Sequence, residues 1–185
     1  MRDPLAELIA ESFEDIPPAK WIVPDDSVRR RLLAAQFEIL VDHAQKYGVV
    51  HVGGEGDAVA IWFDNTTTPV EIESYPERLA AAVGEKWLPR FKAFDEQLLA
   101  HHPHDPHHHL ALLAVRPHRQ SHGLGAELLE RHHEWLDDRG VDAYLEASGP
   151  RSRDLYLRHG YQPLGDPYYL PNDGPPMFPM WRKPR

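Results

Sequence analysis

Residues 109–136 constrain the fold most strongly, because an apolar run, a glycine-containing turn and an amphipathic helix follow one another there. His109 to Val115 reads as a strand, and Gln120-Ser-His-Gly-Leu-Gly-Ala126 reads as the turn. Apolar residues then recur at helical spacing as far as Leu136. The first amides of a helix have no partner within it, so this turn can bind a phosphate or another anion.

Two familiar kinds of phosphate loop do not match the turn. A Walker loop ends in Gly-Lys-Ser/Thr, whereas Ala126 and Glu127 follow Gly125 here, so the lysine and the magnesium-binding hydroxyl are missing. A dinucleotide-binding loop needs a third glycine where Leu128 stands, although Glu146 lies near the position of its acidic residue. Neither a nucleoside triphosphate nor a dinucleotide is therefore the predicted ligand.

A third kind of loop, which binds the pyrophosphate of acyl-CoA, has the pattern Gln/Arg-x-x-Gly-x-Gly/Ala. Gln120, Gly123 and Gly125 meet each of its fixed positions. Glycine also lacks the β-carbon that would keep backbone donors away from a bulky phosphate. Taken alone, the segment is also compatible with an ordinary glycine turn before a surface helix.

A second ordered pattern follows the loop. Residues 142–148 read as a short strand, and residues 151–159 as a short helix that ends at Gly160. The segments Leu145-Glu-Ala-Ser148, Pro150-Arg151 and Leu155-Tyr-Leu-Arg-His-Gly-Tyr161 resemble the second half of the GNAT superfamily of acyl-CoA-dependent N-acetyltransferases. Residues 110–161 carry the motifs of this resemblance.

Within that superfamily, the chain is most similar to puromycin N-acetyltransferase and its relatives. The similarity also includes Asp57-Ala-Val-Ala-Ile-Trp62 and the terminal Met180-Trp-Arg-Lys-Pro184. The resemblance implies one GNAT-like domain over residues 1–185, with an α/β fold in which helices flank a mixed, mostly antiparallel central sheet.

The rest of the chain suits such a sheet. Hydrophobic spacing predicts helices over residues 5–13 and 27–47, with a turn-rich segment between them and Asp26 as the cap of the second helix. A hairpin is expected at 49–52 and 58–63, and a helical region at 75–101 with a break near Gly84. An irregular loop at 167–176 precedes a closing strand at 177–183.

A GNAT domain ordinarily begins with a strand before its first helix, whereas here the first helix starts almost at Met1. The usual first strand is therefore expected to be missing. Two explanations stay open: the true start lies upstream, or the open sheet edge is covered by a loop or by the partner in a homodimer.

Composition narrows the classes of function. The chain has no cysteine, which excludes disulfides, thiolate metal sites and an acyl-cysteine intermediate. The net charge of -9 disfavours a nucleic-acid partner and mildly favours a cationic amine substrate. Neither a membrane-spanning run nor a secretory signal is found in the sequence, so a cytoplasmic protein with no membrane partner is expected.

The resemblance implies acetyl-CoA as co-substrate and direct attack by the amine of a small molecule, aminoacyl-like or drug-like. It places the oxyanion donor at the backbone N–H of Val115 or a neighbour, and the general acid at Tyr156. Ser152 stands where relatives often have an asparagine that contacts the CoA arm. The cofactor-binding residues implied are Val115, Gln120, Ser121, His122, Gly123, Leu124, Gly125, Ala126 and Ser152.

The general base is a weaker prediction, since the strand from Leu110 to Val115 carries no carboxylate. Glu146 is the candidate, acting through a water molecule, and a purely structural carboxylate is the alternative. A different class of function also stays open, namely a non-catalytic acyl-CoA-binding or regulatory domain.

The histidine-rich segment His101-His-Pro-His-Asp-Pro-His-His-His109 raises the question of a metal site. Its two prolines break the run, and no helical i, i+4 pair of ligands is formed. No metal is therefore expected, and the segment is predicted to be a solvated linker into the next strand. His109, which is closest to that strand, can instead face the acceptor pocket.

Overall fold

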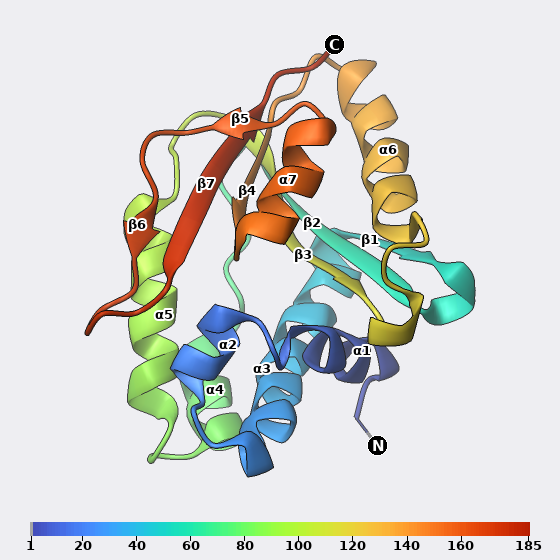
Figure 1. Ribbon diagram of the computed structural model, residues 1–185. Coiled ribbons are helices and arrows are strands. Elements are labelled where there is room, and N and C mark those ends of the chain that lie inside the picture. Colours follow the sequence, from blue (N-terminus) through green and yellow to red (C-terminus); the bar gives the residue numbers. More distant parts are fainter. Residues whose placement is uncertain (1) are drawn as a thin grey trace.

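A computed structural model describes residues 2–185 of the chain (Figure 1). Its helices are α1 (Pro4–Phe13), α2 (Pro17–Ile22), α3 (Asp26–Tyr47), α4 (Tyr75–Val83), α5 (Leu88–His101), α6 (Leu124–Asp137) and α7 (Pro150–Arg158). Its strands are β1 (Val49–Gly53), β2 (Ala58–Asn65), β3 (His107–Val115), β4 (Ala143–Ala147), β5 (Gln162–Pro163), β6 (Tyr168–Tyr169) and β7 (Pro176–Arg182).

The strands form one open sheet in the order β1-β2-β3-β4-β7-β5, and β6 pairs with β7. Only β3 and β4 run parallel, so the predicted mixed, mostly antiparallel sheet is confirmed. Helices α1 through α5 form one core with one face of the sheet, and helices α6 and α7 form a second core with the other face. We call the first the acceptor face and the second the cofactor face, after the roles that we propose for them below.

The predicted helices and their ends are largely confirmed. Asp3 caps α1 through the amide of Leu5 at 2.8 Å, and α3 ends at Gly48. The cap of α3 is Asp25, which accepts from the amide of Ser27, and not Asp26 as predicted. The break near Gly84 separates α4 from α5.

Two segments expected to be irregular contain regular structure. The turn-rich segment before Asp26 includes α2, because Pro17 and Pro18 occupy the first turn of a helix, where a missing N–H costs nothing. The proline-rich loop contains β6, which pairs with β7. The two segments meet where the indole N–H of Trp21 donates to the carbonyl of Pro171 at 3.0 Å.

β1 is the edge strand next to the position of the expected first strand. Within residues 2–185, no strand pairs with its outer edge. Val49 and Val52 of β1 are exposed. The absence of the usual first strand is thus confirmed for the described part of the chain. No helix among these residues is long and apolar enough to cross a membrane.

Candidate active site

The site is organised around a gap between the two parallel strands β3 and β4. These strands pair only where His108 and His109 face Ala143 and Tyr144, although both strands continue further. Ala111 is an extra residue in the pairing of β3 with β2, since Ile61 pairs with Leu112 and Trp62 with Leu110. Such a bulge bends a strand, and β3 diverges from β4 beyond it.

The backbone of β3 directs an amide into this gap. The N–H of Arg116 donates to the carbonyl of Asp57, next to β2, at 2.9 Å. Successive amides of a strand point to opposite sides, so the N–H of Val115 points away from β2 and toward the gap. The residue predicted to supply the oxyanion donor thus has the required direction.

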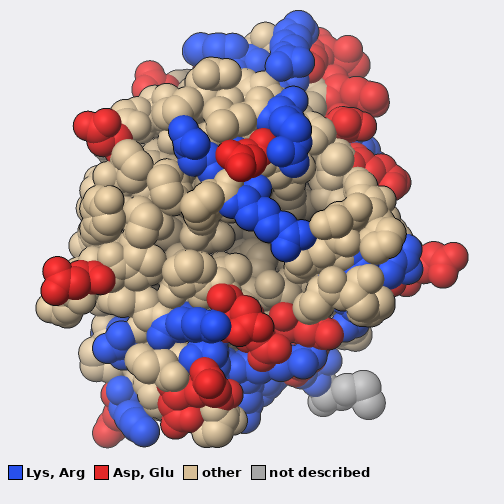
Figure 2. Space-filling model, viewed as in Figure 1, with Lys and Arg blue, Asp and Glu red and all other residues tan. Residues whose placement is uncertain are grey.

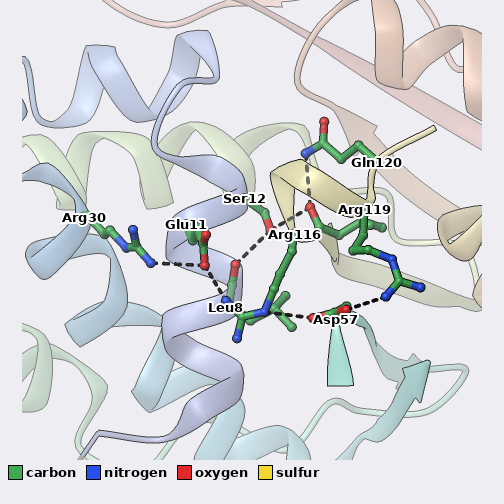
Figure 3. A network of polar contacts seen from close by, with 9 residues as sticks. Leu8, Glu11, Ser12, Arg30, Asp57, Arg116, Arg119 and Gln120 are labelled. Carbon is green, nitrogen blue, oxygen red and sulfur yellow. Dashed lines mark hydrogen bonds and ion pairs between the residues drawn. The ribbon is translucent and has the colours of Figure 1, made fainter. Parts of the chain in front are cut away.

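Ion pairs fix the beginning of the loop that follows β3 (Figure 3). Arg116 pairs with Glu11 of α1 and, at 3.2 Å, with Asp57. Arg119 reaches the other oxygen of the Asp57 carboxylate at 2.9 Å. The first half of the loop is therefore fastened to both α1 and the start of β2.

The carbonyl of Val115 accepts two side-chain hydrogen bonds, also drawn in Figure 3. One comes from Nε2 of Gln120 at 3.1 Å and the other from the hydroxyl of Ser12 at 3.0 Å. Gln120 therefore closes the loop on itself with the amide group that sequence reasoning assigned to the cofactor. This bond explains why a glutamine suits the position before the glycines.

The tip of the loop exposes a series of unpaired donors. Among the described residues, the amides of 121–126 find no hydrogen-bond acceptor, and the first bonded amide is that of Glu127, which donates to the carbonyl of Gly123. Ser121 and Gly123 both have positive φ, at 64° and 85°. Alternation of such a left-handed residue with its neighbours turns adjacent amides toward one anion.

The two glycines of the loop have different roles. Gly123 needs its left-handed backbone, although a β-carbon there would meet no atom within 4 Å. A β-carbon on Gly125 would point toward Val115, Leu113 and Leu155 at 3.7 to 3.9 Å, which is ordinary contact. The expectation that both glycines make room for the ligand is therefore not supported by the position of Gly125.

The start of α7 lies beside the loop tip. Nη2 of Arg151 donates to the hydroxyl of Ser121 at 3.0 Å. The hydroxyl of Ser152 donates to the carbonyl of Gly149 at 3.0 Å and so stabilises the turn into the helix. Figure 2 shows this side of the molecule hollowed between α7 above and the α1–α2 pair below, with Lys and Arg along the upper border.

Tyr156 of α7 lies on the cofactor face of the sheet. Its ring is 8% exposed and contacts the ring of Tyr161 edge-on at 5.7 Å. Its hydroxyl makes no hydrogen bond to another described residue and is not among the fully enclosed polar atoms. Burial raises the pKa of Tyr156 well above its usual value of about 10, so the phenol keeps its proton at neutral pH.

Glu146 lies on the opposite face, where β4 has left β3. Its side chain is 6% exposed, and its Oε1 accepts from the hydroxyl of Tyr168 at 3.3 Å. Nε2 of His109 stands 3.8 Å from Oε2. Sequence reasoning found Glu146 and His109, but it predicted neither their approach nor the bond from Tyr168 to the carboxylate.

The histidine-rich segment is a solvated linker only in its middle, residues 102–106, which corrects the prediction for its two ends. His107 and His108 belong to β3 and are buried, while His101 ends α5. His107 donates from Nδ1 to the carbonyl of Asp105 at 2.6 Å, and its Nε2 lies 3.1 Å from Nε2 of His102. The start of β3 could not be predicted from its polar residues, because their burial depends on partners elsewhere in the chain.

A second set of histidines lies on the cofactor face. His132 of α6 lies between His51 of β1 at 3.0 Å and His108 of β3 at 3.2 Å, with a ring nitrogen toward each. Burial, and after it the nearby histidines, lowers the pKa of His132 to about 3. Among residues 2–185, no group of three His, Cys, Asp or Glu side chains is arranged to hold a metal ion.

Comparisons with known proteins agree with this architecture. Residues 77–161 match the sequence profile of the acetyltransferase (GNAT) family. A structure from Corynebacterium glutamicum, described as histone acetyltransferase HPA2 and related acetyltransferase, is 28% identical, with a TM-score of 0.69 over 97% of this chain and 89% of its own.

Two more distant structures share the fold. Arylalkylamine N-acetyltransferase 2 from Aedes aegypti is 20% identical, with a TM-score of 0.61 over 100% of this chain and 94% of its own. The C-terminal condensation domain of Ebony, in complex with beta-alanyl-dopamine, is 16% identical, with a TM-score of 0.56 over 98% of this chain and 93% of its own.

Proposed function

We propose that this chain is an N-acetyltransferase that acts on a small-molecule amine. Its GNAT fold and the matched family segment support an acetyltransferase of the GNAT superfamily. Acetyl-CoA and the amine bind together, as a ternary complex on one domain spanning residues 1–185, and the acetyl group passes directly between them. The observation that carries the proposal is the row of unpaired amides at 121–126 beside the open end of β3 and β4.

The pyrophosphate of acetyl-CoA is assigned to the loop tip. Backbone donors at the N-terminus of α6 suit two linked phosphates, because the helix dipole also favours negative charge there. Gln120 and Ser12 hold the loop in shape through the carbonyl of Val115. The pantetheine arm then follows the gap between β3 and β4, where unpaired strand amides and carbonyls can bond to it, and Ser152 lies at its border.

The reaction forms a carbon–nitrogen bond and breaks a carbon–sulfur bond. The amine nitrogen attacks the thioester carbon, and the N–H of Val115 stabilises the oxyanion that develops on the carbonyl oxygen. Collapse of this intermediate expels the CoA thiolate, to which Tyr156 donates its phenolic proton, and the nitrogen releases its extra proton to solvent. The raised pKa of Tyr156 favours this role, because the proton is present until sulfur needs it. Solvent then returns a proton to the phenolate.

Glu146 is the proposed general base. An amine with a pKa near 10 arrives protonated and must lose a proton before it can attack. The carboxylate of Glu146 lies where the gap opens on the acceptor face, with Tyr168 bonded to one oxygen and His109 beside the other. The proton can pass to Glu146 directly or through one water molecule.

Puromycin-like aminoacyl amines are first candidates for the acceptor, because of the similarity in Asp57–Trp62 and Met180–Pro184. We further propose that nucleic acid is not a partner, given the net charge of -9. The exposed outer edge of β1 is the surface on which a homodimer would form.

The test is a panel of amines incubated with acetyl-CoA, with release of free thiol as the readout. Thermal unfolding with and without CoA measures cofactor binding on the same protein. Thiol release with at least one amine, together with stabilisation by CoA, is expected. Stabilisation by CoA without turnover of any amine would favour the non-catalytic acyl-CoA-binding domain instead.

A further inference from the structure

Three side-chain nitrogen atoms from separate segments meet at the end of α5. Nε2 of His102, the residue after α5, lies 3.1 Å from Nε2 of His107 in β3. Nδ2 of Asn65, at the end of β2, lies 3.0 Å from the nitrogen of His102 and 3.3 Å from that of His107. His107 is buried, whereas His102 and Asn65 are half-buried, so this cluster is open to solvent on one side.

Hydrogen bonds cannot satisfy all three contacts of the cluster at once. Each imidazole nitrogen presents either an N–H or a lone pair, and the amide of Asn65 presents either its NH₂ group or, when turned over, its oxygen. Among three atoms in mutual contact, at least two are then of the same kind. One contact therefore sets donor against donor or acceptor against acceptor, which is unfavourable unless another group joins the cluster.

The ring of His107 is held in the orientation of a metal ligand. Its Nδ1 donates to the carbonyl of Asp105 at 2.6 Å, which places the ring proton on Nδ1 and leaves a lone pair on Nε2. Metal-binding histidines are ordinarily oriented by such a bond from their other nitrogen. Burial lowers the pKa of His102 to about 4, so this ring is neutral at pH 7 and Nε2 can also present a lone pair.

The spacing of the three atoms suits a transition-metal ion. Tetrahedral ligands at zinc, with Zn–N distances of about 2.0 to 2.1 Å, lie about 3.3 Å from one another. The contacts of 3.0, 3.1 and 3.3 Å are close to this value. The nearby carboxylates also favour a positive charge here, since Glu146 acts to raise the pKa of His102 and Asp105 that of His107.

We propose that His102, His107 and Asn65 bind a zinc ion or a similar divalent transition-metal ion, with the amide turned so that Oδ1 faces the ion and water as the fourth ligand. A cation removes the conflict because all three side chains then present lone pairs. The set contains only two histidines, so it does not count among groups of three His, Cys, Asp or Glu side chains.

The ion joins the end of β2, the start of β3 and the segment after α5. It thereby fastens the long connection between β2 and β3, which carries α4 and α5 over the acceptor face. None of the steps proposed for acetyl transfer uses Asn65, His102 or His107. The metal site and the transfer function can therefore fail independently.

The test uses tag-free protein, purified without a metal column and treated with a chelator, to which zinc chloride is added. Equilibrium dialysis with metal analysis should find one zinc ion per chain, and the midpoint of thermal unfolding should rise with zinc and fall again with chelator. His102→Ala should weaken zinc binding about tenfold or more. Asn65→Asp should strengthen it about tenfold, because a carboxylate is the better ligand.

His104→Ser is the matched control, since His104 is exposed in the same histidine-rich segment. It should bind zinc as the unmodified protein does. Equal losses in His104→Ser and His102→Ala would show adventitious binding by surface histidines and overturn the inference. Absence of stabilisation by zinc, or weaker binding by Asn65→Asp, would overturn it as well. Asn65→Asp decides the matter if His102→Ala fails to fold, because a gain in affinity requires the folded site.

Discussion

The two faces of the sheet differ in how their polar groups are satisfied where β3 leaves β4. On the cofactor face, His132 is bonded through both ring nitrogens and Tyr161 is bonded to His133, so these side chains stabilise the fold. On the acceptor face, Tyr144 has no partner and His109 stops short of Glu146. The histidines of the cofactor face thus bond to one another, whereas the imidazole of His109 and the carboxylate of Glu146 face each other without a hydrogen bond.

Tyr156 tests this comparison, since its hydroxyl, like the buried indole N–H of Trp62, has no hydrogen bond on the cofactor face. Tyr156→Phe keeps the ring and should therefore keep both packing and CoA affinity. Loss of the general acid should lower turnover by about 10² to 10⁴. Steady-state thiol release and CoA binding, measured on the same preparation, check this result.

Tyr169→Phe is the control, because Tyr169 is 67% exposed and lies outside the gap. It should turn over like the unmodified protein. Equal turnover in Tyr156→Phe, with chemistry shown to be rate-limiting, would reject Tyr156 as the acid.

Glu146→Gln should impair the chemistry on the acceptor face and leave CoA binding on the cofactor face unaffected. The amide cannot take a proton, so turnover should fall about 10²-fold or more, while stabilisation by CoA stays as it was. Glu134→Gln, on the exposed side of α6, should leave both quantities unchanged. A parallel loss of CoA binding in Glu146→Gln would mean that the two faces do not act separately.

Substitutions at the two loop glycines should affect CoA binding differently. Gly123→Val forces a β-branched residue into left-handed backbone and should remove most of the stabilisation that CoA confers. That stabilisation is about 2.7 kcal/mol at 100 times the dissociation constant. Gly125→Ala should keep it, since its β-carbon faces Val115 and not the loop amides. Thermal titration that ranks the two variants the other way would contradict the anion site.

Acid should destabilise the fold through its buried histidines. Burial lowers the pKa of His132 and His133 to about 3, whereas the unfolded chain titrates near 6.5. The unfolded state therefore binds more protons between these values, and stability falls as the pH falls from 6.5 toward 3. The slope is at most about 1.4 kcal/mol per pH unit for each histidine. Urea unfolding at pH 7, 6 and 5 measures it, and a flat profile would argue against neutral burial.

The smallest expected effect concerns His104, which is exposed between the two prolines of the histidine-rich segment. His104→Ser should change stability by less than about 0.5 kcal/mol and leave turnover intact, with or without a chelator. A chelator-sensitive activity in protein purified without a metal column would oppose the metal-free mechanism. His107 and His108 are unsuited to this test because both are buried in β3.

The glycine-containing loop and the elements around it could be predicted because their features are local. Glycines, a helix period and an apolar strand all lie within residues 109–136, and hydrogen bonds between neighbours fix the backbone there. Helix α2 escaped prediction because Pro17-Pro18 favours a turn and a first helical turn equally well. Packing of Ile22 and Ala19 into the core selects the helix.

The acceptor face could be predicted only in part because its contacts join distant segments. Glu146 meets Tyr168, which is 22 positions further along the chain and on a two-residue strand. Ala111 bends β3 through a bulge that nothing in the alternation of residues announces. Candidate residues follow from their chemical type, whereas their partners follow from the sheet register.

The bonds of helices α1 and α2 have a consequence for how the chain folds. Ser12 finds its acceptor 103 positions later, at Val115, and Trp21 finds its own 150 positions later, at Pro171. Helices α1 and α3 can pack on each other early, but the bonds of Ser12 and Trp21 must wait until distant segments have folded. Such long-range closure slows folding and favours aggregation of the nascent chain. Loss of the β6–β7 hairpin would thus reduce the yield of native protein even before the chemistry is considered.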